Sequence, residues 1–240
     1  MKEFSATYKI ENLSADDEQS WEVVGRLFEE AFPPEERRPI EALKAQVRKK
    51  QEEEQAKQTY FWVAKSGSKI VGLAFFELIP ATGFAYLWFL AADARVRGQG
   101  VGTSLFQAMW QHLEQAATSL KLDFKGVVFE VDHPLSDEEA IAQKNRQRIH
   151  FYEKQGAVLL PLDFLAPPMW ISSEHTEVLF RLMVKPTSAY QSQVNSLQFI
   201  EEAVVTILSA SQLGYQQPSN SSYYKRAMDS AHLQIEGNPD

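Results

Sequence analysis

Apolar residues follow a helical rhythm near the start of the chain. They recur three or four positions apart, at Trp21, Val24, Leu27, Phe28 and Phe32. This spacing places them on one face and predicts an amphipathic helix. Ser14 or Asp16 can cap its start, and Pro33 and Pro34 end it. A second helix is expected at residues 40–58, where many charged residues predict a largely solvated surface.

Strand patterns follow, with aromatic and β-branched residues between turn-forming segments. They predict strands at residues 60–65, 70–78 and 84–93, after a short first strand at 7–10. Beyond residue 102 the helical rhythm returns, with apolar residues at Leu105, Met109, Leu113 and Leu120. This helix is expected to pack on the sheet.

The middle of the chain continues the alternation of helices and strands. A strand is predicted at residues 127–132. Because a helix separates it from the strand at 84–93, the two are expected to be parallel. A loop and helix at 137–154 and strands at 157–162 and 178–184 complete this part. The pattern predicts a mixed α/β protein.

The character of the chain changes after Pro186. An apolar stripe predicts a helix at residues 190–213; its members are Val194, Leu197, Ile200, Val204, Ile207 and Leu208. Residues 216–220 are polar and include a proline, and the tail after them is expected to be loose. We therefore divide the chain into a domain at 1–186 and a helical extension with a loose tail at 187–240. The extension can cover the core or pair with another subunit, so a homodimer is possible.

Composition narrows the classes of function. The 240 residues are 23% charged and carry a net charge of −8, which argues against nucleic acid or an anionic membrane and favours cationic substrates such as amines. The absence of cysteine excludes disulfides, thiol nucleophiles and cysteine zinc sites. We find neither a signal peptide pattern nor an apolar run of membrane-spanning length. These features predict a cytoplasmic protein.

A glycine-rich segment joins the strand at 84–93 to the helix after residue 102. Gly98, Gly100 and Gly102 allow a ligand to approach the backbone closely, and the free N–H groups of a helix start favour an anion. Arg95 and Arg97 add cations that can pair with phosphate. The segment is therefore a candidate phosphate site. The alternative is a turn that binds nothing.

Spacing distinguishes between phosphate-binding motifs. The glycines do not fit Gly-x-Gly-x-x-Gly, and no lysine follows Gly102 as a P-loop requires. Arg97-x-x-Gly100-x-Gly102 does resemble the pyrophosphate-binding motif of the GNAT superfamily, the acyl-CoA-dependent N-acyltransferases. This identification needs a second element, because spacing alone also allows a ligand-free turn.

The second element lies further along the chain. Asn145, Tyr152 and Gly156 match the GNAT pattern around the helix that flanks the pantetheine arm of CoA, whereas Arg148 and Ala157 depart from it. Asn145 and Tyr152 are seven residues apart and so share a helix face. The resemblance covers roughly residues 5–185. Three segments further resemble a bacterial GNAT subgroup of unassigned substrate, at residues 32–37, 129–134 and 148–156.

Resemblance to this superfamily implies a fold and a donor. The fold is a mixed, twisted and mostly antiparallel sheet flanked by helices, with one splayed pair of parallel strands. The implied co-substrate is acetyl-CoA, with no metal, and the acetyl group passes directly to a primary amine. The residues then expected at CoA are Phe89, Leu90, Ala91, Arg95, Arg97, Gly98, Gln99, Gly100, Val101, Gly102, Thr103, Asn145 and Tyr152.

The same resemblance gives Tyr152 the role of protonating the CoA sulfur. For the base that deprotonates the amine, we rank Glu130 first and Glu77 second, because each is an acid within an apolar strand, where burial raises the carboxyl pKa. Either carboxylate can instead be exposed or paired with an arginine, and a water chain can carry the proton. His133 is a lesser alternative. His112 and His150 are interpreted as structural or surface residues.

The acceptor is left open by the sequence. Glu35 and Glu36, in the turn between the first two helices, are candidates for binding a cationic amine, or are simply a surface acidic turn. The amine can belong to a small molecule or a protein, and another acyl group can replace acetyl. Two other classes remain: an inactive acyl-CoA-binding regulatory or interaction protein, and a nucleotide-phosphate binder unrelated to CoA.

Overall fold

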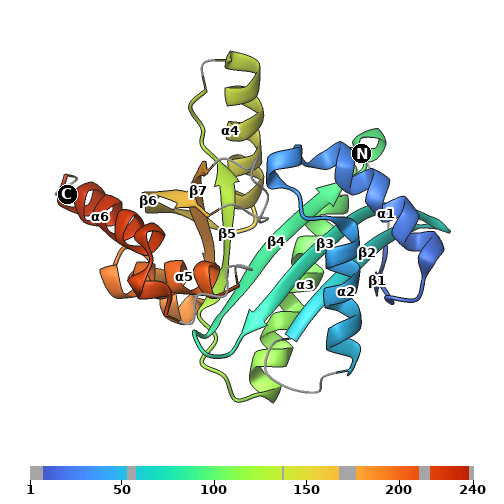
Figure 1. Ribbon diagram of the computed structural model, residues 1–240, viewed down its shortest axis with the longest axis horizontal. Coiled ribbons are helices and arrows are strands. Elements are labelled where there is room, and N and C mark those ends of the chain that lie inside the picture. Colours follow the sequence, from blue (N-terminus) through green and yellow to red (C-terminus); the bar gives the residue numbers. More distant parts are fainter. Residues whose placement is uncertain (1–7, 53–57, 137, 168–176, 211–216, 238–240) are drawn as a thin grey trace, which may run out of the picture. The chain divides into compact units, whose positions relative to one another are not determined.

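A mixed β-sheet organises the computed structural model, which describes residues 8–52, 58–136, 138–167, 177–210 and 217–237 (Figure 1). Within these residues the sheet has seven strands in the order β1-β2-β3-β4-β5-β7-β6. The strands are β1 (Lys9–Asn12), β2 (Gln58–Ser66), β3 (Lys69–Ile79), β4 (Phe84–Ala92), β5 (Gly126–Asp132), β6 (Val158–Ala166) and β7 (Val178–Pro186). Strands β4 and β5 are parallel, and the other recorded pairings are antiparallel.

Helices occupy the segments between and after the strands. The α-helices are α1 (Glu18–Ala31), α2 (Ile40–Glu52), α3 (Val101–Ser119), α4 (Glu139–Glu153), α5 (Leu197–Ala210) and α6 (Ser222–Glu236). Short 3-10 helices are η1 (Pro34–Glu36), η2 (Ala94–Val96), η3 (Ser188–Gln193) and η4 (Pro218–Asn220). In the described segments, no helix has the length and apolar character to cross a membrane. The α/β class and the parallel strand pair predicted from the sequence are confirmed.

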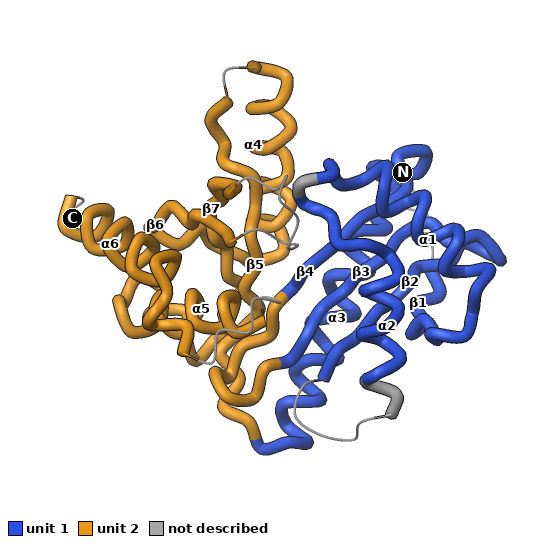
Figure 2. The backbone as a smooth tube through the Cα atoms, in the orientation of Figure 1, with its two compact units in different colours: residues 1–78, 87–121 blue, residues 79–86, 122–240 orange. Residues whose placement is uncertain are grey.

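The chain forms two compact units that share β4 (Figure 2). Unit 1 comprises residues 1–78 and 87–121, and unit 2 comprises residues 79–86 and 122–240. The first residues of β4, Phe84 to Tyr86, thus belong to unit 2, where they pair with β5. The domain boundary at residue 186 stays a prediction.

In unit 1, helices α1 and α2 lie on one face of β2 and β3, and α3 lies on the opposite face (Figure 1). Helix α1 buries Phe28, whose ring meets the Phe89 ring edge-on at 4.7 Å between centroids. Helix α3 approaches β3 closely at Gly72, where an added Cβ would lie 2.6 Å from Val101 Cγ1. The start of α3 is thus seated directly on the sheet, and any larger residue at position 72 would displace it.

In unit 2, β5 pairs with β7, which in turn pairs with β6. Helix α6 packs on β6 and beside α5. Helix α5 buries Phe199, whose ring meets that of Phe84 edge-on at 5.1 Å between centroids. The buried hydroxyl of Thr206 donates to the backbone oxygen of Glu202 and lies 2.8 Å from the hydroxyl of Thr82. The C-terminal helices therefore complete the core of this unit.

Two sequence expectations need correction. The cap of α1 is Asp17, whose Oδ1 accepts a hydrogen bond from the Ser20 N–H at 3.1 Å, and not Ser14 or Asp16. The tail expected to be loose contains α6, capped by the Ser221 hydroxyl. Sequence reasoning missed this helix because its buried face includes two alanines, Ala227 and Ala231, and so gives a weak apolar stripe.

Helix boundaries also differ from the expected ones. The helix expected at 190–213 is divided into η3 and α5. Its expected end, at residues 211–213, lies outside the described residues, as do residues 53–57 of the helix expected at 40–58.

Candidate functional site

The glycine loop, residues 94–103, leads from the end of β4 into the first turn of α3. Gly100 is the N-cap of α3 and has φ +86°, a left-handed conformation that favours glycine. No side chain caps this helix end. Its first N–H groups therefore lack partners within the helix and point outward together with the positive end of the helix dipole. Gly98 is also left-handed, and a Cβ added at either glycine would meet no other atom within 4 Å. This geometry suits an anion.

The two arginines of the glycine loop differ in their surroundings. The Arg95 guanidinium contacts the Asp93 carboxylate through Nε at 2.9 and 3.0 Å and through Nη2 at 2.6 Å. Hydrogen bonds from the Arg95 side chain and backbone hold the pKa of Asp93 below its ordinary value. Arg97 makes no ion pair with the described residues. We expected both arginines to pair with phosphate. Because Arg95 is already paired with Asp93, Arg97 is the stronger candidate for binding a phosphate group.

The remaining residues of the glycine loop are held by local contacts. The Tyr8 hydroxyl donates to the backbone oxygen of Gln99 at 2.9 Å, and the Ser104 N–H donates to that of Gly100 at 2.9 Å. Val101 is buried against Gly72. On β4, Phe89 and Ala91 are buried, whereas Leu90 is partly exposed. The expected backbone contacts of residues 89–91 with a thioester stay a prediction.

In unit 2, Glu130 on β5 lies beside Tyr86 on the parallel strand β4. The Tyr86 hydroxyl donates to Glu130 Oε2 at 2.6 Å. Burial raises the pKa of Glu130 to about 7, although the hydrogen bond from Tyr86 acts in the opposite direction. A carboxyl group with this pKa is divided between its two protonation states near neutral pH, as a general base requires.

Glu77 in unit 1 has a different environment. Its side chain is 2% exposed. Oε1 accepts from Gln46 Nε2 at 2.7 Å and from the Thr59 hydroxyl at 2.9 Å, while Oε2 accepts from Trp88 Nε1 at 3.0 Å. Three donors from three different elements hold this carboxylate in place, as in a structural hydrogen-bond network.

Helix α4 carries the second predicted motif. Asn145 and Tyr152 are both buried, in agreement with a shared helix face. The Asn145 amide donates to the backbone oxygen of His133 at 2.9 Å, so it already holds the segment after β5. The Tyr152 ring contacts the Phe129 ring at 4.3 Å between centroids, and burial raises the pKa of Tyr152 to about 12. This phenol is neutral at physiological pH and can serve as an acid.

Arg148, which departs from the GNAT pattern, has a structural partner. Its Nη1 lies 2.7 Å from Asp132 Oδ2, at the end of β5. The ion pair joins α4 to that strand. Arg148 therefore contributes to the position of α4, the helix that carries Asn145 and Tyr152.

The lesser candidates are also located. His133 Nδ1 accepts the Leu135 N–H at 3.2 Å, and its Nε2 lies 3.6 Å from Asp163 Oδ1. This arrangement makes His133 a weak base candidate. Glu35 and Glu36 lie in η1, between α1 and α2.

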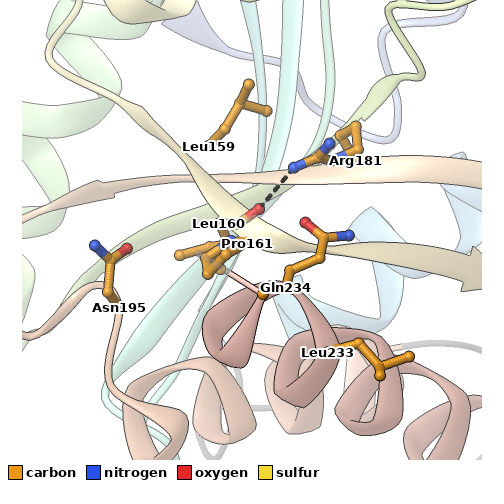
Figure 3. Close-up of a pocket in the computed structure, with 8 residues that line it drawn as sticks. Leu159, Leu160, Pro161, Arg181, Asn195, Leu233 and Gln234 are labelled. Carbon is orange, nitrogen blue, oxygen red and sulfur yellow. Dashed lines mark hydrogen bonds between the residues drawn. The ribbon is translucent and has the colours of Figure 1, made fainter. Parts of the chain in front are cut away.

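A cavity of about 480 Å³ lies within unit 2, between β6, β7 and α6 (Figure 3). Arg181 and Gln234 contribute polar groups to its lining. The Arg181 guanidinium donates to the Leu160 backbone oxygen at 3.1 Å and lies 3.5 Å from Asp163, which balances its charge. None of the predicted site residues lines this cavity.

A known protein family matches the part of the chain that carries the glycine loop and both candidate bases. The sequence model of the Acetyltransferase (GNAT) family matches residues 21–134, which include Glu77, the glycine loop and Glu130. Residues 21–134 of this chain are therefore similar to the GNAT family. The match ends before α4, so the roles of Asn145 and Tyr152 rest on the motif alone. No curated protein matches the sequence.

Several solved structures of acetyltransferases resemble the chain over most of its length. A protein from Bacteroides thetaiotaomicron described as a GNAT-family acetyltransferase has 20% identity and a TM-score of 0.55, covering 82% of this chain and 99% of that one. PaiA N-acetyltransferase from Thermoplasma acidophilum, in complex with coenzyme A, has 14% identity and a TM-score of 0.52, with 75% and 99% covered. Spermidine/spermine N-acetyltransferase SpeG from Vibrio cholerae has 14% identity and a TM-score of 0.50, with 79% and 98% covered. At these sequence identities, the similarities show that the fold is shared and say nothing about the substrate.

Each compact unit brings together some of the predicted site residues. Unit 1 holds the glycine loop and Glu77, and unit 2 holds Glu130, Asn145 and Tyr152. Sequence reasoning missed Tyr86. No sequence signal could have found it, because its place opposite Val128, two residues before Glu130 on the same face of β5, follows from the strand pairing.

Proposed function

We propose that this chain transfers an acetyl group from acetyl-CoA directly to a primary amine. The observation that carries the proposal is left-handed Gly100 at the uncapped start of α3, with Arg97 beside it. Such a helix start offers several N–H donors to the pyrophosphate of CoA, and Arg97 adds a cation. The similarity of residues 21–134 to the GNAT acetyltransferase family supports acetyl-CoA as the donor, and so does the coenzyme A complex of PaiA.

The proposed chemistry balances with two proton transfers. The amine nitrogen forms a bond to the acetyl carbon as the carbon–sulfur bond breaks. Glu130 accepts the proton that the amine loses, and Tyr152 donates a proton to the departing sulfur. Backbone N–H groups near Phe89 to Ala91 stabilise the oxyanion of the thioester carbonyl. The products are an acetylamide and free CoA.

For the acceptor, we propose a small cationic amine of the polyamine class. The net charge of −8 favours cations near the protein. The fold relative SpeG is named for spermidine and spermine. Glu36, in η1, is the residue proposed to attract the second charge of such an amine, and the side chain of Glu35 lies outside the described part of the structure. A protein amine is the alternative acceptor.

The direct test is release of free thiol from acetyl-CoA over a panel of amines. The panel contains spermidine, spermine, cadaverine, a lysine peptide and a peptide with a free N-terminus. We expect turnover with at least one amine, highest with a polyamine. Turnover with the peptides alone would reject a polyamine and show that the acceptor is a protein amine.

An equilibrium measurement separates the enzyme from the two other classes. CoA binding by calorimetry without thiol release from any amine would support an inactive regulatory protein. Preferential binding of ATP or NAD over CoA would reject the acyl-CoA assignment itself. The variant Arg97→Ala is expected to weaken CoA binding about tenfold, and Arg95→Ala by less, because Asp93 already neutralises Arg95.

A further inference from the structure

The side-chain hydrogen bond to Glu130 comes from a residue outside the predicted GNAT motifs. Tyr86 is 2% exposed, and its hydroxyl lies 2.6 Å from Glu130 Oε2. The residues sit on adjacent parallel strands, with Tyr86 aligned with Val128 and Glu130 two positions further on β5. Side chains two positions apart on a strand share a face, so the pairing itself brings the phenol beside the carboxylate.

This contact restricts the carboxylate to one orientation. Burial of the Tyr86 ring leaves its hydroxyl little freedom to move, and an oxygen–oxygen distance of 2.6 Å is typical of a strong bond to a charged acceptor. Among the described side chains, Tyr86 is the hydrogen-bond donor to Glu130. The bond engages Oε2 and leaves Oε1 without another donor among the described side chains, while the backbone N–H of Glu130 itself is a second donor to the carboxylate.

We propose that Tyr86 is a positioning residue for acetyl transfer, which holds Glu130 Oε2 so that Oε1 faces the amine and takes its proton. The inference rests on the proposed function, because it requires Glu130 to be the base. Tyr86 neither gains nor loses a proton in the reaction. Its hydroxyl stabilises the ionised carboxylate before the amine binds, and so increases the fraction of protein ready to act.

The environment of Glu130 makes this contact measurable by titration. On β7, the residue opposite Glu130 is Leu182, which has no charge. The ion pair of Asp132 with Arg148 and the side chain of Arg181 lie nearby along the strands, but burial and the Tyr86 bond dominate the pKa of Glu130. Removal of the phenol oxygen should therefore raise this pKa.

Tyr86→Phe is the test variant, and Tyr224→Phe is its matched control. Tyr224 also donates to a glutamate, Glu201, at 2.6 Å, but it does so at the surface on α6. In Tyr86→Phe we expect kcat to fall about tenfold at pH 7, while the KM for acetyl-CoA stays unchanged. The acid limb of the pH profile of kcat should move to a higher pH by about 0.5 to 1 unit, because the pKa of Glu130 rises. Tyr224→Phe should change neither. An unchanged kcat and pH profile in Tyr86→Phe would overturn the proposal.

A double-mutant cycle tests whether Tyr86 acts through Glu130. In the Glu130→Gln background, Tyr86→Phe should have no further effect on kcat, because the base is already absent. Additive losses in the double variant would show that Tyr86 acts by another route and would overturn the positioning role.

A carboxyl carbon NMR titration of Glu130 provides a readout that does not depend on turnover. The carboxyl pKa should be higher in Tyr86→Phe than in the unmodified protein, and an equal pKa would reject the contact. If the unmodified protein releases no thiol with any amine, the proposed function fails, and the titration still decides whether Tyr86 controls Glu130. Retained near-ultraviolet circular dichroism shows that the variant is folded.

Discussion

The indole N–H of Trp88 lies 3.0 Å from Oε2 of Glu77, and this bond completes a set of three donors around one buried carboxylate. We expect Glu77 to support the fold of unit 1. Replacing Glu77 with glutamine would turn an N–H₂ group toward at least one of these donors. The variant should lose about 2 kcal/mol of unfolding free energy in urea denaturation.

The same variant tests the ranking of the two glutamates. Glu201→Gln, which alters one exposed acceptor, is the control and should keep its stability within about 0.5 kcal/mol. If Glu77→Gln keeps its stability but releases no thiol from acetyl-CoA, Glu77 and not Glu130 is the base.

Gly100 allows a test of the glycine loop with a strain-matched control. Gly100→Ala places a Cβ in a left-handed residue and should cost about 1 kcal/mol of stability. Gly67, in the turn between β2 and β3, is also left-handed with open space around it, so Gly67→Ala carries the same strain. Only Gly100→Ala should weaken CoA binding, by about tenfold in calorimetry. Equal CoA affinity in both variants would mean that the glycine loop does not bind the pyrophosphate.

Glu130 should make stability depend on pH. Its folded pKa of about 7 is above the ordinary value of 4.5, so the folded protein holds this proton more tightly than the unfolded chain. Stability should therefore fall as pH rises from about 4.5 to about 7, by up to about 3 kcal/mol. Glu130→Gln removes this titration and can still accept the Tyr86 hydrogen bond.

Measuring the Tm of Glu130→Gln and of the unmodified protein at two pH values isolates the contribution of Glu130 to the pH dependence of stability. Glu130→Gln should have a higher Tm than the unmodified protein at pH 8 and a similar one at pH 4.5, and it should lose acetyl transfer. A pH-independent difference in Tm would contradict the raised pKa.

Tyr152 should act as an acid over the whole physiological range. With its pKa raised to about 12, the phenol stays protonated below about pH 10, so it should give no descending limb in the pH profile of kcat below that value. Tyr152→Phe should lower kcat about 10²-fold without changing the affinity for CoA.

A second tyrosine in unit 2 provides the control. The pKa of Tyr190 is also about 12, because its hydroxyl is bonded to Asp123. Tyr190→Phe should keep full activity. A descending limb near pH 8 that disappears in Tyr152→Phe would show that the raised pKa is wrong.

Most of the helices and strands could be predicted because they depend on the spacing of side chains within a short stretch of sequence. The periodic apolar residues of α1 and α3 and the three successive strands follow from side-chain spacing, which depends only on neighbouring residues. The left-handed conformation of Gly100 is a local property of the same kind. Alternation in β5 also separated Glu130 from Val131 and Phe129. In contrast, α6 escaped prediction because its alanines become buried only when β6 lies beneath them.

What the sequence alone determined is the glycine loop, the order of helices and strands from β1 to β7, and the motifs that resemble the GNAT superfamily. The tertiary structure decided which partner each charged residue has. Arg95 is paired with Asp93, Glu77 is surrounded by three donors, and Glu130 has Tyr86 as its donor. The last two choices depend on strand pairing between residues far apart in the chain, which no local pattern encodes. The difference between a structural carboxylate and a candidate base is therefore a property of the fold.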